Sequence, residues 1–212
     1  IACGAKNPPS AVEEVISQDF VEPVKETSSI EPVAERPRQG IVLNGQYVDV
    51  RWDDGDTFSG TMIVDGKTER IKARMNGYNT LESYGPVHRW GNWTPDELYL
   101  LAKESGVVAS EGLWECTNLN SGGGYGRKLV DCPQLRRSLL LKGLAHPFSI
   151  GRPASGDDIA AMKEAMDKGV GIWAKGVPKT LITSLHSADE NAEKEPYNRI
   201  CNLSDGSCDA VN

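Results

Sequence analysis

The sequence lacks a long apolar run and an excess of basic charge. Its longest apolar stretch, SLLLKGLA at 138–145, is interrupted by Lys142 and falls well short of the roughly 18 apolar residues that a membrane-spanning helix needs. The formal net charge of the 212 residues is −7, so the chain as a whole does not attract a polyanion. We therefore expect no membrane-spanning helix and no binding of nucleic acid through overall basicity.

The acidic charge is unevenly distributed. Residues 1–40 contain 4 basic and 7 acidic side chains, residues 41–176 contain 16 and 17, and residues 177–212 contain 3 and 6. The middle of the chain is therefore nearly neutral, and the acidity lies towards both ends. With 39% hydrophobic residues, a chain of this length can bury one core of ordinary domain size.

The cysteines form no CxxC pair, and no histidine lies at a metal-ligand spacing, so a structural zinc site is not expected. The five cysteines are Cys3, Cys116, Cys132, Cys201 and Cys208. Cys116 and Cys132 are equidistant from Gly124, as opposed residues of a hairpin are, and Cys201 and Cys208 flank the turn-like NLSDGS. This spacing favours two local disulfides in an oxidising compartment. The alternative is five reduced thiols in a cytosolic protein.

Cys3 is then the odd cysteine. It lies in IACG, which resembles the end of a bacterial lipoprotein signal, whose cysteine becomes the lipidated first residue. We expect membrane attachment through a lipid on Cys3 and a bacterial cell-envelope location, as a periplasmic or surface lipoprotein, or secretion. Envelope proteins are the expected protein partners.

The pattern divides the chain into three parts. Residues 1–40 are rich in Pro, Glu, Val and Ser and predict a flexible tether, although a short helix across SAVEEVISQDF is an alternative. Residues 41–176 contain short β-like runs such as IVLNGQYVDVRW and DTFSGTMIVDG, separated by turns. Residues 177–212 predict a polar, loosely packed tail that a small disulfide loop ties at Cys201 and Cys208.

Helix signals follow the first strands. Thr94 is an N-cap candidate, followed by Pro95 and acidic residues, and Ser155 precedes a second acidic first turn with apolar residues at helical spacing. QLRRSLLLKGLA fits either a helix or a strand. The expected fold is α+β, mainly β: a five-stranded barrel of the oligonucleotide/oligosaccharide-binding type with about three helices.

Six short motifs occur in an order that resembles the staphylococcal nuclease, or thermonuclease, family. They lie between about Val48 and Trp173 and are DGDT (54–57), NTLE (79–82), YGP (84–86), YGR (125–127), GLA (143–145) and GIW (171–173). The resemblance covers about 60% of the chain and leaves both tails unexplained. It implies calcium-dependent hydrolysis of DNA and RNA phosphodiesters.

The resemblance also implies roles for individual residues. Asp56, Asn79 and Thr80 occupy the positions of the calcium site, where oxygen ligands suit a hard cation. Glu82 matches the glutamate that positions or deprotonates the attacking water. The remaining candidates are two arginines that bind the phosphate and a tyrosine at the substrate, Arg74, Arg127 and Tyr125.

Three departures weaken this interpretation. Asn79 replaces a ligating aspartate and brings no charge, so calcium affinity should fall. Small or aliphatic residues near Ser149 and Gly151 replace tyrosines that pack on the nucleotide, and the strong basicity of the family is missing. Binding of nucleic acid is therefore expected to be weak and salt-sensitive.

Two functions remain open from the sequence. The first is a calcium-dependent nuclease in which Arg74, Glu82 and Arg127 act on one phosphate. The second is a catalytically degenerate barrel that serves as a scaffold or binding module in an envelope assembly. An Asp-Gly pair is common in hairpin turns, so DDGD alone is typical of a solvated turn. His88, His146 and His186 are isolated, and packing or surface roles are expected for them.

Overall fold

The computed structural model describes residues 39–82, 92–178, 181–183 and 199–210. Residues 1–38 of the tether expected at 1–40, with Cys3, the motif at 84–86, His88 and His186, lie outside these residues. The last residue of the expected tether, Gly40, already belongs to the first strand. The helices are α1 (Pro95–Glu111), α2 (Pro133–Leu141), α3 (Gly156–Lys168) and the short 3-10 helix η1 (Gly171–Trp173). The strands are β1 (Gly40–Leu43), β2 (Gln46–Trp52), β3 (Thr57–Val64), β4 (Lys67–Met75), β5 (Tyr78–Thr80), β6 (Leu113–Gly122), β7 (Lys128–Asp131), β8 (Ala145–Pro147), β9 (Ser149–Ile150), β10 (Leu181–Thr183), β11 (Arg199–Cys201) and β12 (Ser207–Ala210).

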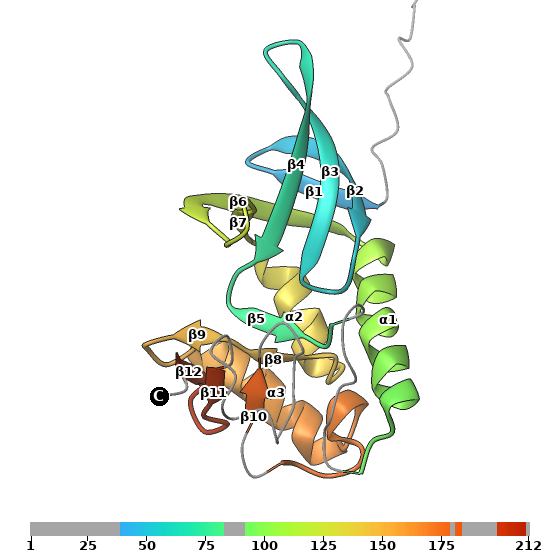
Figure 1. Ribbon diagram of the computed structural model, residues 1–212, viewed down its shortest axis with the longest axis vertical. Helices are drawn as coiled ribbons and strands as arrows, with labels where there is room; N and C mark the ends of the chain where they lie inside the picture. The colour runs from blue at the N-terminus through green and yellow to red at the C-terminus, as the bar shows by residue number, and fades with distance from the viewer. Residues whose placement is uncertain (1–38, 83–91, 179–180, 184–198, 211–212) are drawn as a thin grey trace, which may run out of the picture. The chain divides into compact units, whose positions relative to one another are not determined.

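The fold is α+β and contains a closed barrel with strand order β1-β2-β3-β4-β7-β6 (Figure 1). Strands β1 to β4 form an antiparallel meander. The barrel closes through two parallel pairings, β4 with β7 and β1 with β6. The expected combination of a barrel with three α-helices is therefore confirmed.

The strand count of the barrel differs from the expected five. The run that starts at Ile41 makes two strands, because Asn44 and Gly45 adopt positive φ angles of 51° and 83° and turn the chain back on itself. Ile41 then pairs with Val48 across this turn. Asn-Gly favours such two-residue hairpin turns, since both residues tolerate the left-handed region. The barrel accordingly has six strands.

Local signals explain where the helices begin and end. Thr94 caps α1 by accepting a hydrogen bond from the Glu97 N–H at 3.3 Å, and Glu97 Oε2 accepts one from the Thr94 N–H at 2.9 Å. Ser155 caps α3 in the same way by accepting from the Asp158 N–H at 3.1 Å. α3 ends at Gly169, whose φ of 59° suits a left-handed C-cap. The ambiguous QLRRSLLLKGLA segment forms α2.

Two clusters of buried side chains form the core. One fills the barrel and includes Ile41, Val48 and Phe58, with Leu135 and Leu139 of α2 packed against them. The second includes buried residues of α1, α3, η1 and the C-terminal strands: Leu98, Met162, Trp173, Leu181 and Cys208. The two clusters together hold the helices against one end of the barrel.

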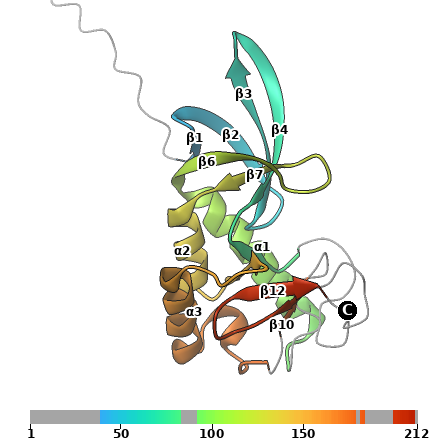
Figure 2. The same ribbon diagram turned by 90° about the vertical axis from the view of Figure 1, so that its left-hand side faces the viewer.

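The described C-terminal residues are more ordered than the expected loose tail. β10, β11 and β12 form a sheet with β9, in the order β10-β11-β12-β9. Figure 2 shows β12 and β10 beside α3, and the buried sulfurs of Cys201 and Cys208 belong to the second core cluster. A disulfide joins Cys201 to Cys208, and a second disulfide joins Cys116 to Cys132. Among the described residues, none of the helices is both long and apolar enough to cross a membrane.

Candidate active site

The acidic turn between β2 and β3 is buried. Asp54 is 5% exposed and Asp56 is 0% exposed, whereas a solvated hairpin turn would leave both carboxylates in water. α1 supports the turn through Ser105, whose Oγ accepts a hydrogen bond from the Gly55 N–H at 3.0 Å. A Cβ on Gly55 would lie 2.8 Å from Ser105, so this close approach requires glycine. Tyr78, fully buried, donates its hydroxyl to the Gly55 carbonyl at 2.7 Å.

Three donors satisfy the Asp56 carboxylate. Oδ1 accepts hydrogen bonds from Arg74 Nη1 at 2.5 Å and from the Thr57 hydroxyl at 3.0 Å. Oδ2 accepts from the Thr80 backbone N–H at 2.8 Å. Burial of a carboxylate is unfavourable unless the group is paired and hydrogen-bonded, and both conditions hold here. Asp56 therefore joins β3, β4 and β5 at one point.

Arg74 is held between two acceptors. Its Nη1 bonds to Asp56, and its Nη2 donates to Asn79 Oδ1. Its pKa is raised: burial alone would lower it, but the charges of Asp56, Glu82 and Asp54 act in the opposite direction. A guanidinium has five N–H groups, and these contacts use two of them. The side chain is thus fixed in place as a permanent positive charge.

Asn79 links Arg74 to the Thr80 backbone. Its Oδ1 accepts from Arg74, and its Nδ2 donates to the Thr80 carbonyl at 3.0 Å. Asn79 and Thr80 are each 2% exposed. In this arrangement the Asn79 amide orients the arginine, and its oxygen faces a guanidinium.

Glu82 follows β5 and completes a cluster of acidic side chains. Burial, followed by the charges of Asp56 and Asp54, raises the pKa of Glu82 to about 9, while Arg74 and Arg127 act to lower it. Burial and then the Asp56 charge also raise the pKa of Asp54 to about 8. The cluster therefore carries more carboxylates than its arginines compensate, a condition that favours an added positive charge.

Arg127 approaches from the loop between β6 and β7. Its Nε donates to the Gly124 carbonyl at 3.2 Å, and its guanidinium lies 5.5 Å from the centre of the Tyr125 ring. Tyr125 is 74% exposed and has a φ of 52°, so the tip of the loop presents its ring to solvent. Gly124 and Gly126 allow the bend with φ angles of 74° and 73°. Gly123 allows the loop to approach β4 closely, because a Cβ there would lie 2.8 Å from the Arg74 side chain.

A cavity of about 920 Å³ joins these groups. Its lining includes Arg74, Glu82 and Arg127, together with Asn79 and Tyr125. The structure thus brings the three expected catalytic side chains to one cavity. Asp56 and Thr80 lie behind the wall and hold Arg74 and the end of β5 in place.

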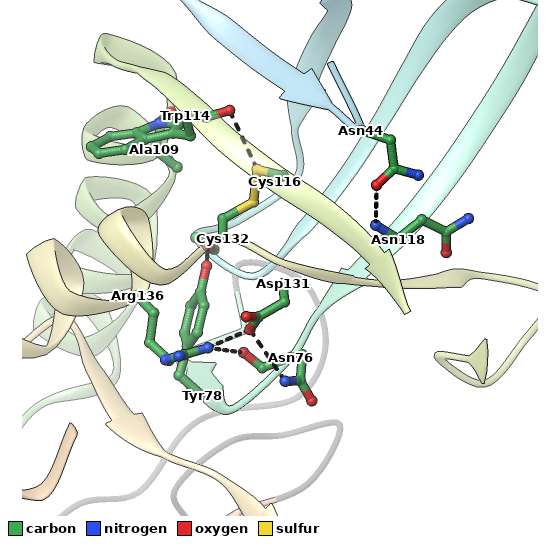
Figure 3. Close-up of a disulfide and its surroundings, with 11 residues drawn as sticks. Asn44, Asn76, Tyr78, Ala109, Trp114, Cys116, Asn118, Asp131, Cys132 and Arg136 are labelled. Carbon is green, nitrogen blue, oxygen red and sulfur yellow. Dashed lines mark hydrogen bonds and ion pairs between the residues drawn. A yellow bond between two sulfur atoms is a disulfide. The ribbon is translucent and has the colours of Figure 1, made fainter. Parts of the chain in front are cut away.

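Arg136 lines the cavity but is engaged by protein acceptors. Its guanidinium donates to Asp131 and to the Asn76 carbonyl (Figure 3). Its Nε donates to Asp158 at 3.0 Å. The Cys116–Cys132 disulfide lies next to this network, since Cys132 directly follows Asp131. These contacts join β7, α2 and α3 and support the strand that follows Arg127.

The oxygen donors around Asp56 fit a hard cation in type. Asp56 has one carboxylate, Asn79 an amide oxygen and Thr80 a backbone carbonyl, and calcium prefers such oxygens. Within the described part of the chain, no three Asp, Glu, His or Cys side chains are grouped as metal ligands. A cation here would compete with Arg74 for Asp56 and Asn79, so binding would be weak.

No model of a known protein family matches the chain, and no curated protein matches it.

Two cavity-lining arginines, Arg152 and Arg199, are not among the residues that the sequence motifs select. His146, for which a packing or surface role was expected, is 3% exposed on β8 with Asn79 as its strand partner. Arg152 lies outside the six motifs. Arg199 reaches the cavity through strand pairing at long range, which no local motif indicates.

Proposed function

We propose that the protein is a weak, calcium-dependent nuclease of the thermonuclease type, which hydrolyses phosphodiester bonds of DNA or RNA. The observation that carries the proposal is the convergence of Arg74, Glu82 and Arg127 on one cavity. Their mutual influence on the Glu82 pKa supports it, because both arginines act on that carboxyl group. The six-stranded barrel is compatible with an oligonucleotide/oligosaccharide-binding fold in which the first strand is divided at Asn44.

The proposal gives each side chain a role. Arg74 and Arg127 would bind the non-bridging phosphate oxygens and stabilise the charge that develops there. Ionised Glu82 would accept a proton from water as the water oxygen attacks phosphorus and the bond from phosphorus to the leaving oxygen breaks. Asp56, Asn79 and Thr80 would hold calcium, which supplies positive charge to the phosphate and favours ionised Glu82.

An assay of the full chain tests this function. The substrate is a fluorescently labelled single-stranded DNA oligonucleotide, with calcium or with EGTA, and the variants are Glu82→Gln and Glu104→Gln. Glu104 is exposed on α1, outside the cavity lining, and serves as the matched control. We expect cleavage only with calcium, a loss of about 100-fold or more in Glu82→Gln, and unchanged cleavage in Glu104→Gln. Equal cleavage by Glu82→Gln would assign the activity to a contaminant.

A catalytically degenerate binding module is the second candidate. The observation in its favour is that Asn79 Oδ1 and Asp56 Oδ1 both bond to Arg74, so the expected calcium ligands are engaged by the protein itself. Calorimetry with calcium and a nucleoside bisphosphate separates the two candidates. No heat of binding at millimolar ligand would favour the binding module over the nuclease.

A further inference from the structure

Two buried hydroxyl groups hold the turn that carries Asp56. Ser105 Oγ accepts a hydrogen bond from the Gly55 N–H at 3.0 Å, and Tyr78 donates its hydroxyl to the Gly55 carbonyl at 2.7 Å. Figure 1 shows the turn between β2 and β3 beside α1, the helix that contains Ser105. Neither Ser105 nor Tyr78 lines the cavity, so each can influence a substrate only through the turn.

These two contacts fix successive peptide planes of the turn. The Gly55 N–H belongs to the plane that joins Asp54 to Gly55, and the Gly55 carbonyl belongs to the plane that joins Gly55 to Asp56. The second plane has a further bond, because the Asp56 N–H donates to Asp54 Oδ1 at 3.1 Å. With both planes held, the backbone angles of Gly55 are fixed, although glycine is the most flexible residue. The position from which the Asp56 side chain leaves the main chain is therefore fixed as well.

The turn is also packed closely on both sides. A Cβ on Gly55 would lie 2.8 Å from the Ser105 side chain on α1 and 2.8 Å from Thr80 Cγ2 on β5. The next residue of the helix, Gly106, faces the turn as well, since a Cβ there would lie 3.5 Å from Asp54 Cα. The backbone of the turn thus fits between α1 and β5 with no room for another conformation at Gly55.

Ser105 interrupts the buried stripe of α1. The other buried residues of this helix are apolar, namely Leu98, Ala102 and Ala109. Ser105 Oγ donates its proton to the Ala102 carbonyl at 2.7 Å, which leaves its lone pairs to accept from the Gly55 N–H. Alanine would fit this stripe and has the higher helix propensity. The hydroxyl group therefore serves the turn rather than the helix.

Tyr78 connects the turn to β5. Burial, followed by the charge of Asp56, raises the pKa of Tyr78 well above its ordinary value, so its hydroxyl remains a donor to Gly55. Two residues along β5, the Thr80 N–H donates to Asp56 Oδ2 at 2.8 Å. The strand consequently holds both the backbone of the turn and its carboxylate.

We propose that Ser105 and Tyr78 are positioning residues of the nuclease site, which hold the Gly55 peptide so that the Asp56 carboxylate is placed for calcium. This inference rests on the proposed function. Arg74 also binds Asp56, so calcium meets a competitor at this carboxylate. A turn that is already held in one conformation reduces the ordering cost of binding. Loss of either hydroxyl contact should weaken calcium binding and leave the chemical step unchanged once calcium is bound.

Ser105→Ala tests the contact from α1, and Ser110→Ala is its matched control. Ser110 lies on the exposed side of the same helix, where its hydroxyl donates to the Val107 carbonyl at 2.7 Å, the same kind of bond that Ser105 makes to Ala102. Calorimetric titration of the full chain with calcium measures the dissociation constant. We expect it to rise about tenfold in Ser105→Ala, comparable to the loss of one hydrogen bond, and to stay unchanged in Ser110→Ala.

Tyr78→Phe tests the contact from β5, because it removes only the hydroxyl group. Tyr47→Phe is its control: Tyr47 is 41% exposed on β2, and its hydroxyl donates to the Gln39 carbonyl at 3.2 Å. The calcium dissociation constant should again rise about tenfold in Tyr78→Phe and remain at the wild-type value in Tyr47→Phe.

Cleavage of a single-stranded DNA octamer at increasing calcium separates positioning from a general loss of structure. Ser105→Ala and Tyr78→Phe should each need about tenfold more calcium for half-maximal rate and reach the wild-type kcat at saturating calcium. A purely structural role would lower the rate by the same factor at every calcium concentration. Urea unfolding in EGTA measures the folded fraction of each variant independently of calcium.

Two results would overturn the positioning role while leaving the nuclease intact. One is a wild type that requires calcium beside two variants that keep its calcium affinity and half-saturation. The other is a loss of rate in the variants that saturating calcium does not restore. A wild type that neither binds calcium nor cleaves the octamer refutes the proposed function, and the positioning role with it.

Discussion

At the scale of single residues, the decisive feature is a turn aspartate removed from water. Asp56 is fully buried and exchanges its hydration for bonds to Arg74, Thr57 and the Thr80 N–H. Its neighbour Asp53 has a side chain 34% exposed, which lies 3.6 Å from Arg51 across the surface. The same residue type therefore has a structural role at one position of the turn and a surface role at another.

This contrast yields a stability prediction. Asp56→Asn should lower the free energy of unfolding by about 3 kcal/mol, because it leaves the buried Arg74 charge without its carboxylate. Asp53→Asn, the matched change in the same turn, should cost less than about 1 kcal/mol, since surface ion pairs contribute little. Urea unfolding in EGTA measures both values. Equal losses in the two variants would contradict the assigned role of the Asp56–Arg74 pair.

The buried His146 side chain should make the stability of the protein depend on pH. Burial lowers its pKa to about 4 from the ordinary 6.5, while its Nδ1 lies 2.9 Å from the Pro147 carbonyl. As the pH falls from 6.5 towards 4, the unfolded chain binds a proton at this side chain and the folded protein does not, so stability decreases. The difference in unfolding free energy between wild type and His146→Gln should shrink by about 2 kcal/mol from pH 7 to pH 5.

The variant is compared with the wild type because Asp54 and Glu82 titrate in both proteins, so their contributions to the pH dependence of stability cancel in the difference. Their raised pKa values act in the opposite direction, since the folded protein keeps protons that the unfolded chain releases above pH 4. Urea unfolding at pH 7, 6 and 5 provides the difference. A difference independent of pH would mean that His146 is accessible to protons in the folded protein.

At the scale of the elements, caps determine where α1 starts. The reciprocal bonds between Thr94 and Glu97 satisfy backbone donors at the first turn, and Glu97 also bonds to Lys175 Nζ at 2.6 Å. Thr94→Ala should cost about 1 kcal/mol of stability. Ser110→Ala, near the other end of α1, removes only an exposed hydroxyl bonded to the Val107 carbonyl and should change stability by less than about 0.5 kcal/mol. Thermal unfolding distinguishes the two.

Elements that begin or end at a local signal could be predicted from the sequence. Elements whose order depends on long-range packing could not. The caps at Thr94 and Ser155 lie where the sequence indicates. The split of the first strand at Asn44 carried a local signal, the Asn-Gly turn, which the expected strand count overlooked. β12, by contrast, gains its order from pairing with β9, about 60 residues earlier, and a disulfide ties β12 to β11.

At the scale of the whole molecule, the same distinction applies to the site. Arg74, Glu82 and Arg127 could be placed together from the ordered motifs, because Glu82 and Arg127 lie in two of them and Arg74 lies five residues before Asn79. Arg199 could not, since its position depends on how the C-terminal sheet packs against the second core cluster. Net charge was also misleading as a guide to the site: the chain carries −7, but five arginines line its cavity.

This separation of charge predicts the salt dependence of binding. Arg127, Arg152 and Arg74, which has the single carboxylate partner Asp56, line the cavity and can each meet a backbone phosphate, whereas two carboxylates, Asp131 and Asp158, hold Arg136. Three phosphate contacts on a single strand give a slope of about −2 for the logarithm of the association constant against the logarithm of salt concentration. Fluorescence anisotropy of a labelled octamer in EGTA measures the slope without cleavage. Arg152→Gln should reduce its magnitude by about 0.7, the contribution of one phosphate contact. A wild-type slope near zero would mean that the acidic exterior, and not the arginine-lined cavity, governs the encounter with nucleic acid.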